Sequence, residues 1–298
     1  MERYLPQLLL VLTTLFWSGN FVVARLMHQS MPPLSLSFWR WMLALLILLP
    51  WVWPKMRAEQ VQLRRHWRLL LLLAVLGVAN FNSFVYIGLQ STTATNATLL
   101  QSVLPATVVA LSVLLLGIRI RPLQLVGLLL SLSGVACIVL QGRLEQLAAL
   151  QFNRGDLWIL AAMLSWATYT VALRWRPETI SALALLGSTV AIGALVILPF
   201  YLWELLVQGR GFELVPGNLA TLGYVALFPS VLAYFFWNYG VARLGAARAG
   251  LYINLMPIFG MGLSILFLDE QPEGYHLLGL TLVLGGILLA SRTGAESR

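Results

Sequence analysis

The chain has 298 residues, of which 59% are hydrophobic and only 10% are charged, whereas soluble domains usually carry about 25% charged residues. A soluble fold would leave much of this apolar surface exposed, so the composition favours a membrane protein. The net charge is +8 and there is one cysteine, Cys137, which excludes an intramolecular disulfide and a multi-cysteine metal site.

Ten apolar segments of a length suited to crossing a bilayer follow one another along the chain, since roughly 20 such residues are needed. They cover residues 5–27, 34–53, 69–89, 95–117, 122–141, 156–173, 180–202, 219–240, 249–268 and 275–291. The first is too long for a signal-peptide core, so we expect it to be retained. The breaks between the segments are too short to hold a soluble domain.

The basic residues predict the orientation, because Lys and Arg concentrate in cytoplasmic loops. With the N-terminus inside, the inner segments hold fourteen Lys and Arg residues, the outer ones hold four, and Arg40 lies within a helix. Both termini are therefore expected in the cytoplasm. The basic residues act as topology signals, which argues against a nucleic-acid partner.

The two halves of the chain resemble each other. With a shift of 152 residues, positions 84–134 overlay 236–286 without gaps, and 16 of 51 are identical. The matches include Gly127/Gly279, Pro105/Pro257 and Gly134/Gly286, while a shift of 149 pairs Trp17 with Trp166.

Each half carries five of the predicted helices, an odd number, so the second half must enter the membrane from the opposite face. The expected fold is an all-α integral membrane protein of ten transmembrane helices. Its organisation is a first five-helix repeat over 1–141, a periplasmic-side connecting loop over 142–155, and an inverted second repeat over 156–298. Inverted repeats are a common plan of alternating-access transporters, with the substrate site between the halves.

Several short motifs carry a family resemblance over essentially the whole chain. They are Trp17-Ser18-Gly19-Asn20, Trp39-Arg40-Trp41, Leu104-Pro105, its repeat Met256-Pro257, and the acidic turn Asp269-Glu270. With these motifs the chain resembles the EamA-type drug/metabolite transporters, and among them it is most similar to YddG-type amino-acid exporters. The resemblance implies a carrier in the bacterial inner membrane that exports amino acids.

Polar side chains inside the predicted helices are the best clues to a site, because they are costly in a bilayer unless they face protein or water. Residues on equivalent helices of both halves could line a central cavity with aromatic faces and amide groups, a chemistry suited to amino acids and amphipathic metabolites. The predicted substrate-binding residues are Trp17, Asn20, Asn82, Tyr86, Ser102, Trp166, Tyr169, Tyr234, Asn238, Tyr252 and Asn254.

The alternative is that these side chains only join helices to one another. Arg40, two turns into the second helix, could bind a substrate carboxylate, extend toward the membrane surface, or hold backbone carbonyls of a neighbouring helix. Pro105 and Pro257, near the centres of two equivalent helices, could be static bends or hinges for alternating access.

The apolar segments hold no carboxylate far from their ends, and the three histidines fall at helix ends or in loops. This favours transport without an obligate proton-coupling carboxylate, although Glu204 or Asp156 could still serve. Neither a phosphate-binding loop, a metal cluster nor a nucleophile–base pair is visible. The sequence therefore predicts no enzyme, cofactor or metal, and no oligomeric state follows from it.

The leading hypothesis is a secondary transporter that exports aromatic and other neutral amino acids by alternating access. Export of drugs or other small metabolites is the nearest alternative. A pore or a non-transporting scaffold is the alternative from a different class. The expected partners are a small-molecule substrate and the lipid bilayer.

Overall fold

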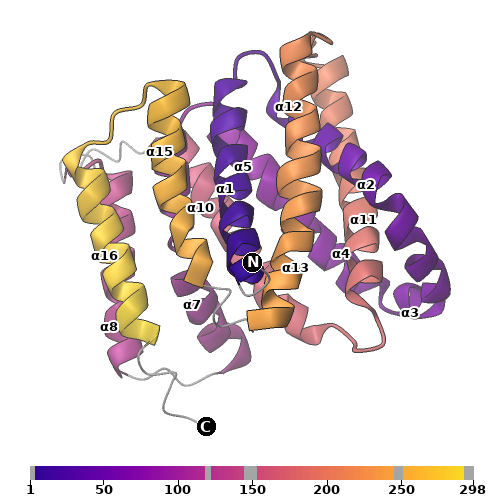
Figure 1. Ribbon diagram of the computed structural model, residues 1–298, viewed down its shortest axis with the longest axis horizontal. Coiled ribbons are helices and arrows are strands. Elements are labelled where there is room, and N and C mark those ends of the chain that lie inside the picture. Colours follow the sequence, from indigo (N-terminus) through magenta and orange to yellow (C-terminus); the bar gives the residue numbers. More distant parts are fainter. Residues whose placement is uncertain (1–3, 118–121, 144–152, 245–250, 292–298) are drawn as a thin grey trace.

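A computed structural model of the chain describes residues 4–117, 122–143, 153–244 and 251–291, and within these ranges the regular structure is helical. In Figure 1, α8 and α16 form one edge of the molecule, and α2 and α11 lie at the opposite edge. Helices α1 and α10 lie between these two edges. Both chain ends and most of the predicted connecting loop 142–155 fall outside the described residues.

The first half begins with α1 (Leu5–Leu26) and α2 (Pro33–Ala58), followed by the short α3 (Gln60–Arg65). A third span combines α4 (Trp67–Ala74), the π-helical segment η2 (Val75–Asn80) and α5 (Phe81–Gly88). It is followed by α6 (Ala94–Gln101), α7 (Leu104–Leu116) and α8 (Pro122–Val139).

The second half begins with α10 (Arg154–Ala172), the 3₁₀ turn η3 (Leu173–Trp175) and α11 (Ala182–Leu206). A long span then combines α12 (Pro216–Leu227), the π-helical segment η4 (Phe228–Leu232) and α13 (Ala233–Leu244). The 3₁₀ segment η5 (Leu251–Leu255), α15 (Met256–Leu268) and α16 (Gly274–Ser291) complete the half.

Among the described residues, seven helices are long and apolar enough to cross a membrane, or eight if the bent pair α6–α7 counts as one span. The apolar helices Tyr252–Leu268 and Gly274–Gly286 are shorter. The chain is thus a multi-pass helical membrane protein, and the count of ten spans stays a prediction.

Two helices extend further than predicted. α2 continues to Ala58 through Pro50 and Pro54, and α11 continues to Leu206 through Pro199. Each proline removes one backbone hydrogen bond, but the helix ends only where flanking contacts no longer support it. The extra turn of α11 carries Glu204 into the folded core, where only 2% of its surface is exposed.

The two extended helices cap each other. The Glu204 carboxylate of α11 accepts hydrogen bonds from the backbone N–H of Leu34 (3.3 Å) and of Ser35 (2.7 Å) in the first turn of α2. In return, the Glu59 carboxylate after α2 accepts one from the N–H of Ser181 (2.8 Å), the N-cap residue of α11. Carboxylates satisfy unpaired N–H groups and complement the helix dipole, so α2 and α11 are held as an antiparallel pair.

The pair α8–α16 is joined through small residues. A β-carbon added at Gly134 would lie 2.6 Å from the carbonyl oxygen of Gly279, and one added at Gly286 would clash with the carbonyl of Gly127. Between these two contacts the Ser131 hydroxyl donates to the carbonyl of Val283 (3.3 Å). The backbones approach closely because the glycines lack side chains, which is typical of packing in membranes.

Irregular backbone recurs at positions 152 residues apart. The π-helical segment η4 begins at Phe228, and η2 covers the matching residue Leu76. The helices α7 and α15 begin at Leu104 and Met256 and end at Leu116 and Leu268. Both are followed by a left-handed residue, Gly117 (φ 65°) in the first case and Asp269 (φ 53°) in the second. The sequence match between the halves therefore extends to the detailed course of the backbone.

Candidate functional site

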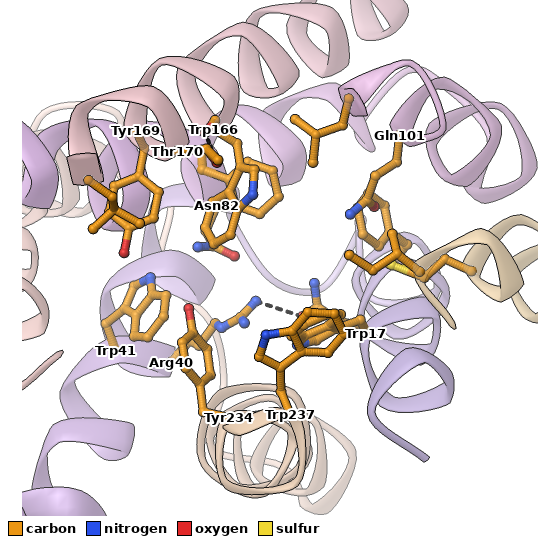
Figure 2. Close-up of a pocket in the computed structure, with 17 residues that line it drawn as sticks. Trp17, Arg40, Trp41, Asn82, Gln101, Trp166, Tyr169, Thr170, Tyr234 and Trp237 are labelled. Carbon is orange, nitrogen blue, oxygen red and sulfur yellow. Dashed lines mark hydrogen bonds between the residues drawn. The ribbon is translucent and has the colours of Figure 1, made fainter. Parts of the chain in front are cut away.

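A cavity of about 280 Å³ lies among helices from both halves of the chain. Figure 2 shows aromatic rings around most of it, with the polar side chains Arg40, Asn82 and Gln101 among them. The lining residues are Trp17, Asn20, Phe21, Arg40, Trp41, Phe81, Asn82, Gln101, Leu104, Trp166, Tyr169, Thr170, Leu173, Tyr234, Trp237, Ile253 and Met256.

Six of the predicted substrate-binding residues line this cavity, and Arg40 does so as well. The six are Trp17, Asn20, Asn82, Trp166, Tyr169 and Tyr234. They come from α1, α5, α10 and α13, and the structure therefore brings together the equivalent helices of the two halves. That they bind a substrate remains a prediction.

Aromatic contacts fix the walls of the cavity. The rings of Trp17 and Trp237 lie 5.5 Å apart, and Trp166 contacts Phe81 at 4.7 Å between centroids. The Trp17 indole N–H donates to the carbonyl of Pro229 (3.2 Å), in the π-helical segment η4. Because a π turn leaves carbonyl groups out of the regular ladder, η4 can supply this acceptor.

Arg40 is the one charged side chain among the lining residues. Only 5% of its surface is exposed. Its Nε donates to the Ser230 hydroxyl (2.7 Å), and its Nη1 donates to Asn20 Oδ1 (2.9 Å) and to the Tyr86 hydroxyl (2.8 Å). The guanidinium carbon also lies 5.0 Å from the centre of the Trp41 ring.

All the acceptors around Arg40 are neutral, and within the described part of the chain no carboxylate pairs with it. These hydrogen bonds join it to side chains of three helical segments, rather than to backbone carbonyls. A buried cation without a counter-charge is costly, and an anionic group entering the cavity would reduce that cost.

Tyr86 lies behind the cavity wall. It is 1% exposed, and its hydroxyl donates to Asn20 Oδ1 (2.8 Å) while accepting from Arg40. The i, i+4 spacing with Asn82 places both on one face of α5, but Tyr86 lies one turn further along and past the cavity. Its contacts fit a role in orienting Asn20 and Arg40.

The remaining predicted residues lie elsewhere. Asn238 is exposed on α13, where Trp237 faces the cavity instead, and Tyr252 is partly buried outside the lining. Ser102 and Asn254 line a small adjacent hollow together with Pro105 and Pro257.

Pro105 and Pro257 are each the second residue of a helix, α7 and α15, rather than mid-helix residues. The helix axis bends by 42° between α6 and α7, directly before Pro105. A proline at a helix start has no N–H to leave unpaired, so the chain is interrupted there at low cost. The hollow around the two prolines shares Gln101, Ile253 and Met256 with the cavity.

Several residues that line the cavity were not predicted from the sequence. Gln101, Trp237 and Trp41 are direct neighbours of the predicted Ser102, Asn238 and Arg40. Two of them have polar atoms without a partner: the Gln101 side-chain oxygen, which accepts, and the Trp41 indole N–H, which donates. In Figure 2 these residues lie on opposite sides of the cavity. Two unsatisfied groups of opposite kind suit a ligand that both donates and accepts hydrogen bonds.

The buried carboxylates lie outside the cavity. Asp156, in the first turn of α10, accepts from the Thr92 hydroxyl and from the Asn96 amide, whose oxygen lies 2.9 Å from His276 Nε2. Glu204 caps α2. Both stand near helix ends, as the sequence predicts, but Asp156 (0% exposed), Glu204 and His276 (4%) are all buried.

Comparisons with known proteins match the chain at nearly full length. A family model described as the EamA-like transporter family matches twice, over residues 5–140 and 153–292. An uncharacterized transporter of Archaeoglobus fulgidus is 32% identical over 95% of this chain and 96% of its own length.

Two further relatives carry names that mention amino acids. A probable amino-acid metabolite efflux pump of Escherichia coli is 26% identical over 94% of this chain and 93% of its own. A probable terminal-alkyne amino-acid exporter of Streptantibioticus cattleyicolor is 25% identical over 95% and 92%. A solved crystal structure with 20% identity superposes with a TM-score of 0.63 over 98% of this chain and 99% of that chain, and it shares the fold.

Proposed function

The chain belongs to the EamA-like transporter family, and on that premise we propose that it exports aromatic and other neutral amino acids by alternating access. The carrying observation is the cavity between the halves, in which Arg40 is buried without a counter-charge among aromatic walls. A substrate carboxylate would compensate the guanidinium, and the aromatic walls would accept an apolar side chain. The names of two relatives support this substrate class.

The repeated backbone supports two inverted five-helix units, 1–141 and 156–298. The capping between α2 and α11, the paired glycine contacts of α8 and α16, and the double match of the family model are what such a plan predicts. Units of this kind can move against each other around a central site. The interruptions before Pro105 and Pro257 border the cavity and are the proposed points of flexion.

The proposed location is the bacterial inner membrane, with both termini in the cytoplasm. The distribution of basic residues supports this orientation. None of the described residues that line the cavity is a carboxylate, and Asp156 and Glu204 are both engaged in hydrogen bonds near helix ends. We therefore propose uniport, that is, transport that is not coupled to protons.

Uptake and counterflow of a labelled amino-acid panel in proteoliposomes test the proposal. We expect saturable flux that amino acid on the opposite side accelerates, with no response to a proton gradient of either sign. Linear flux would indicate a pore, and a response to the gradient would exclude uniport.

Export of drugs or other small metabolites is the second candidate, because most of the lining is apolar or aromatic. Competition between amino acids and cationic amphipathic drugs separates the two. Inhibition by the drugs without inhibition by amino acids would favour the second candidate.

A further inference from the structure

A second hollow, of about 480 Å³, lies at the end of α2 where the chain turns through α3 into α4. Figure 1 shows α3 at the outer edge of the molecule, and the hollow shares no lining residue with the central cavity. The hollow is lined by Trp53, Met56, Arg57, Gln60, Leu63, Arg64, Trp67, Leu70, Ser188, Ala191 and Ile192.

The polar rim of this hollow is strongly basic. Residues 54–68 contain five Lys and Arg residues and one acid, Glu59. The Glu59 carboxylate is bound to the N–H of Ser181 at the start of α11. Arg57 and Arg64, the two basic residues in the lining, form no ion pair within the described part of the chain. Both guanidinium groups are thus available to an anionic ligand.

The walls below the rim are apolar. Leu63 and Leu70 line the hollow together with Ala191 and Ile192 of α11. Trp53 is shared with a neighbouring apolar hollow of about 460 Å³, lined otherwise by Leu46, Leu49, Pro50 and Pro54. From Arg57 back to Leu46 the helix rises roughly 16 Å, which is about half the hydrocarbon thickness of a bilayer.

The tryptophans mark the level of the membrane surface. Trp53 and Trp67 are 57% and 55% exposed, and Trp favours the boundary between headgroups and acyl chains. The two arginines therefore stand at headgroup depth, with the apolar walls extending into the hydrocarbon.

We infer that this hollow, named the α3 groove here, binds an anionic phospholipid. Arg57 and Arg64 hold the phosphate, and the acyl chains run along α2 and α11. Basic residues beside an apolar groove between transmembrane helices suit an acidic headgroup better than a zwitterionic one, because the latter carries its own cation. The inner leaflet is assigned from the proposed orientation, but binding itself does not depend on the transport function.

The chain offers a matched pair of variants. R57Q/R64Q removes the two arginines of the α3 groove, whereas K55Q/R65Q removes the same charge from exposed neighbours outside it. Native mass spectrometry of the full-length protein in detergent would measure binding of phosphatidylglycerol and phosphatidylcholine.

We expect the wild type to prefer phosphatidylglycerol, and R57Q/R64Q to lose about thirtyfold in its affinity, since each arginine near an anionic surface contributes roughly a factor of five. K55Q/R65Q should stay within about threefold of the wild type. Equal losses in both variants, or equal binding of the two lipids by the wild type, would overturn the inference.

A third variant keeps the charge and changes the shape. Ala191→Trp fills the apolar wall, so it should weaken phosphatidylglycerol binding while both arginines remain. Soluble glycerol phosphate should not displace the lipid. Displacement by it, or unchanged binding in Ala191→Trp, would show that the site recognises the phosphate without the acyl chains, and would overturn the inference.

Discussion

The two halves of the chain share their scaffold and differ in what they present to the cavity. α2 and α11 cap each other, and the glycines of α8 and α16 make paired contacts. Yet α2 places Arg40 in the cavity, and α11 has no equivalent there. A shift of 149 residues matches Arg40 with Thr189 of α11, which is absent from the lining. Helix packing thus keeps the symmetry of the halves, whereas the charged side chain of the cavity comes from the first half.

The largest expected effect is a loss of stability at the glycine contacts between α8 and α16, which the two halves share. Gly134→Val and Gly286→Val should each destabilise the fold by about 3 kcal/mol, because either side chain meets the backbone of the facing helix. Thermal denaturation in detergent measures the loss. Gly262→Val is the control, since a β-carbon there would meet no atom within 4 Å beyond its own helix backbone and chain neighbours. Unequal losses for Gly134 and Gly286 would contradict equivalent contacts.

The next largest effect is a loss of transport, expected at Arg40, where the two halves differ. Arg40→Gln removes the guanidinium of the cavity, and counterflow of a neutral amino acid should fall by roughly 10- to 100-fold if a charge-assisted bond of about 1.5–3 kcal/mol is lost. Asn20 and Tyr86 each lose one hydrogen-bond donor, so the melting temperature must be recorded in parallel. Wild-type counterflow in a folded variant would remove Arg40 from the site.

The two capping glutamates should differ in strength. Glu204→Gln should destabilise the fold by about 1–2 kcal/mol, because this buried carboxylate accepts from three donors in and beside the first turn of α2. Glu59→Gln should cost less than about 1 kcal/mol, since Glu59 is partly exposed and accepts one bond from Ser181. Thermal denaturation of both variants side by side measures this, and the opposite order would refute the assignment.

The smallest effect is expected at the counterpart of Arg40. The Thr189 hydroxyl bonds only within its own helix, to the carbonyl of Leu185 (2.8 Å) and, at longer range, to that of Leu186. Thr189→Val should therefore change counterflow by less than about twofold. A loss as large as that of Arg40→Gln would mean that both halves contribute equally.

Sequence patterns predicted the helices well because each depends on a run of apolar residues with clear breaks. They also placed Trp17, Trp166, Asn82 and Tyr234 near one another, because the repeat puts them at equivalent depth. Helix ends were less predictable: α11 runs to Leu206 rather than to the predicted end at residue 202, so Glu204 lies in the helix and is buried rather than in a loop.

It was harder to predict which side chains of a helix point into the cavity. Trp237 and Asn238 are three and four residues after Tyr234, and both spacings lie on the same stripe of a helix. Only the packing of α13 turns Trp237 inward and leaves Asn238 exposed. Likewise, the hydrogen bonds of Arg40 join residues far apart in the chain, and no local pattern records them.

The proposed contact between Arg40 and the substrate carboxylate is tested most directly by removing each partner in turn. Phenylalanine and phenylethylamine differ in that carboxylate, and both can be tested as competitors of counterflow by wild type and by Arg40→Gln. We predict that the wild type prefers phenylalanine by at least about tenfold, and that the variant loses this preference because phenylalanine alone weakens. A preference of equal size in both proteins would contradict the central claim that Arg40 receives the substrate carboxylate.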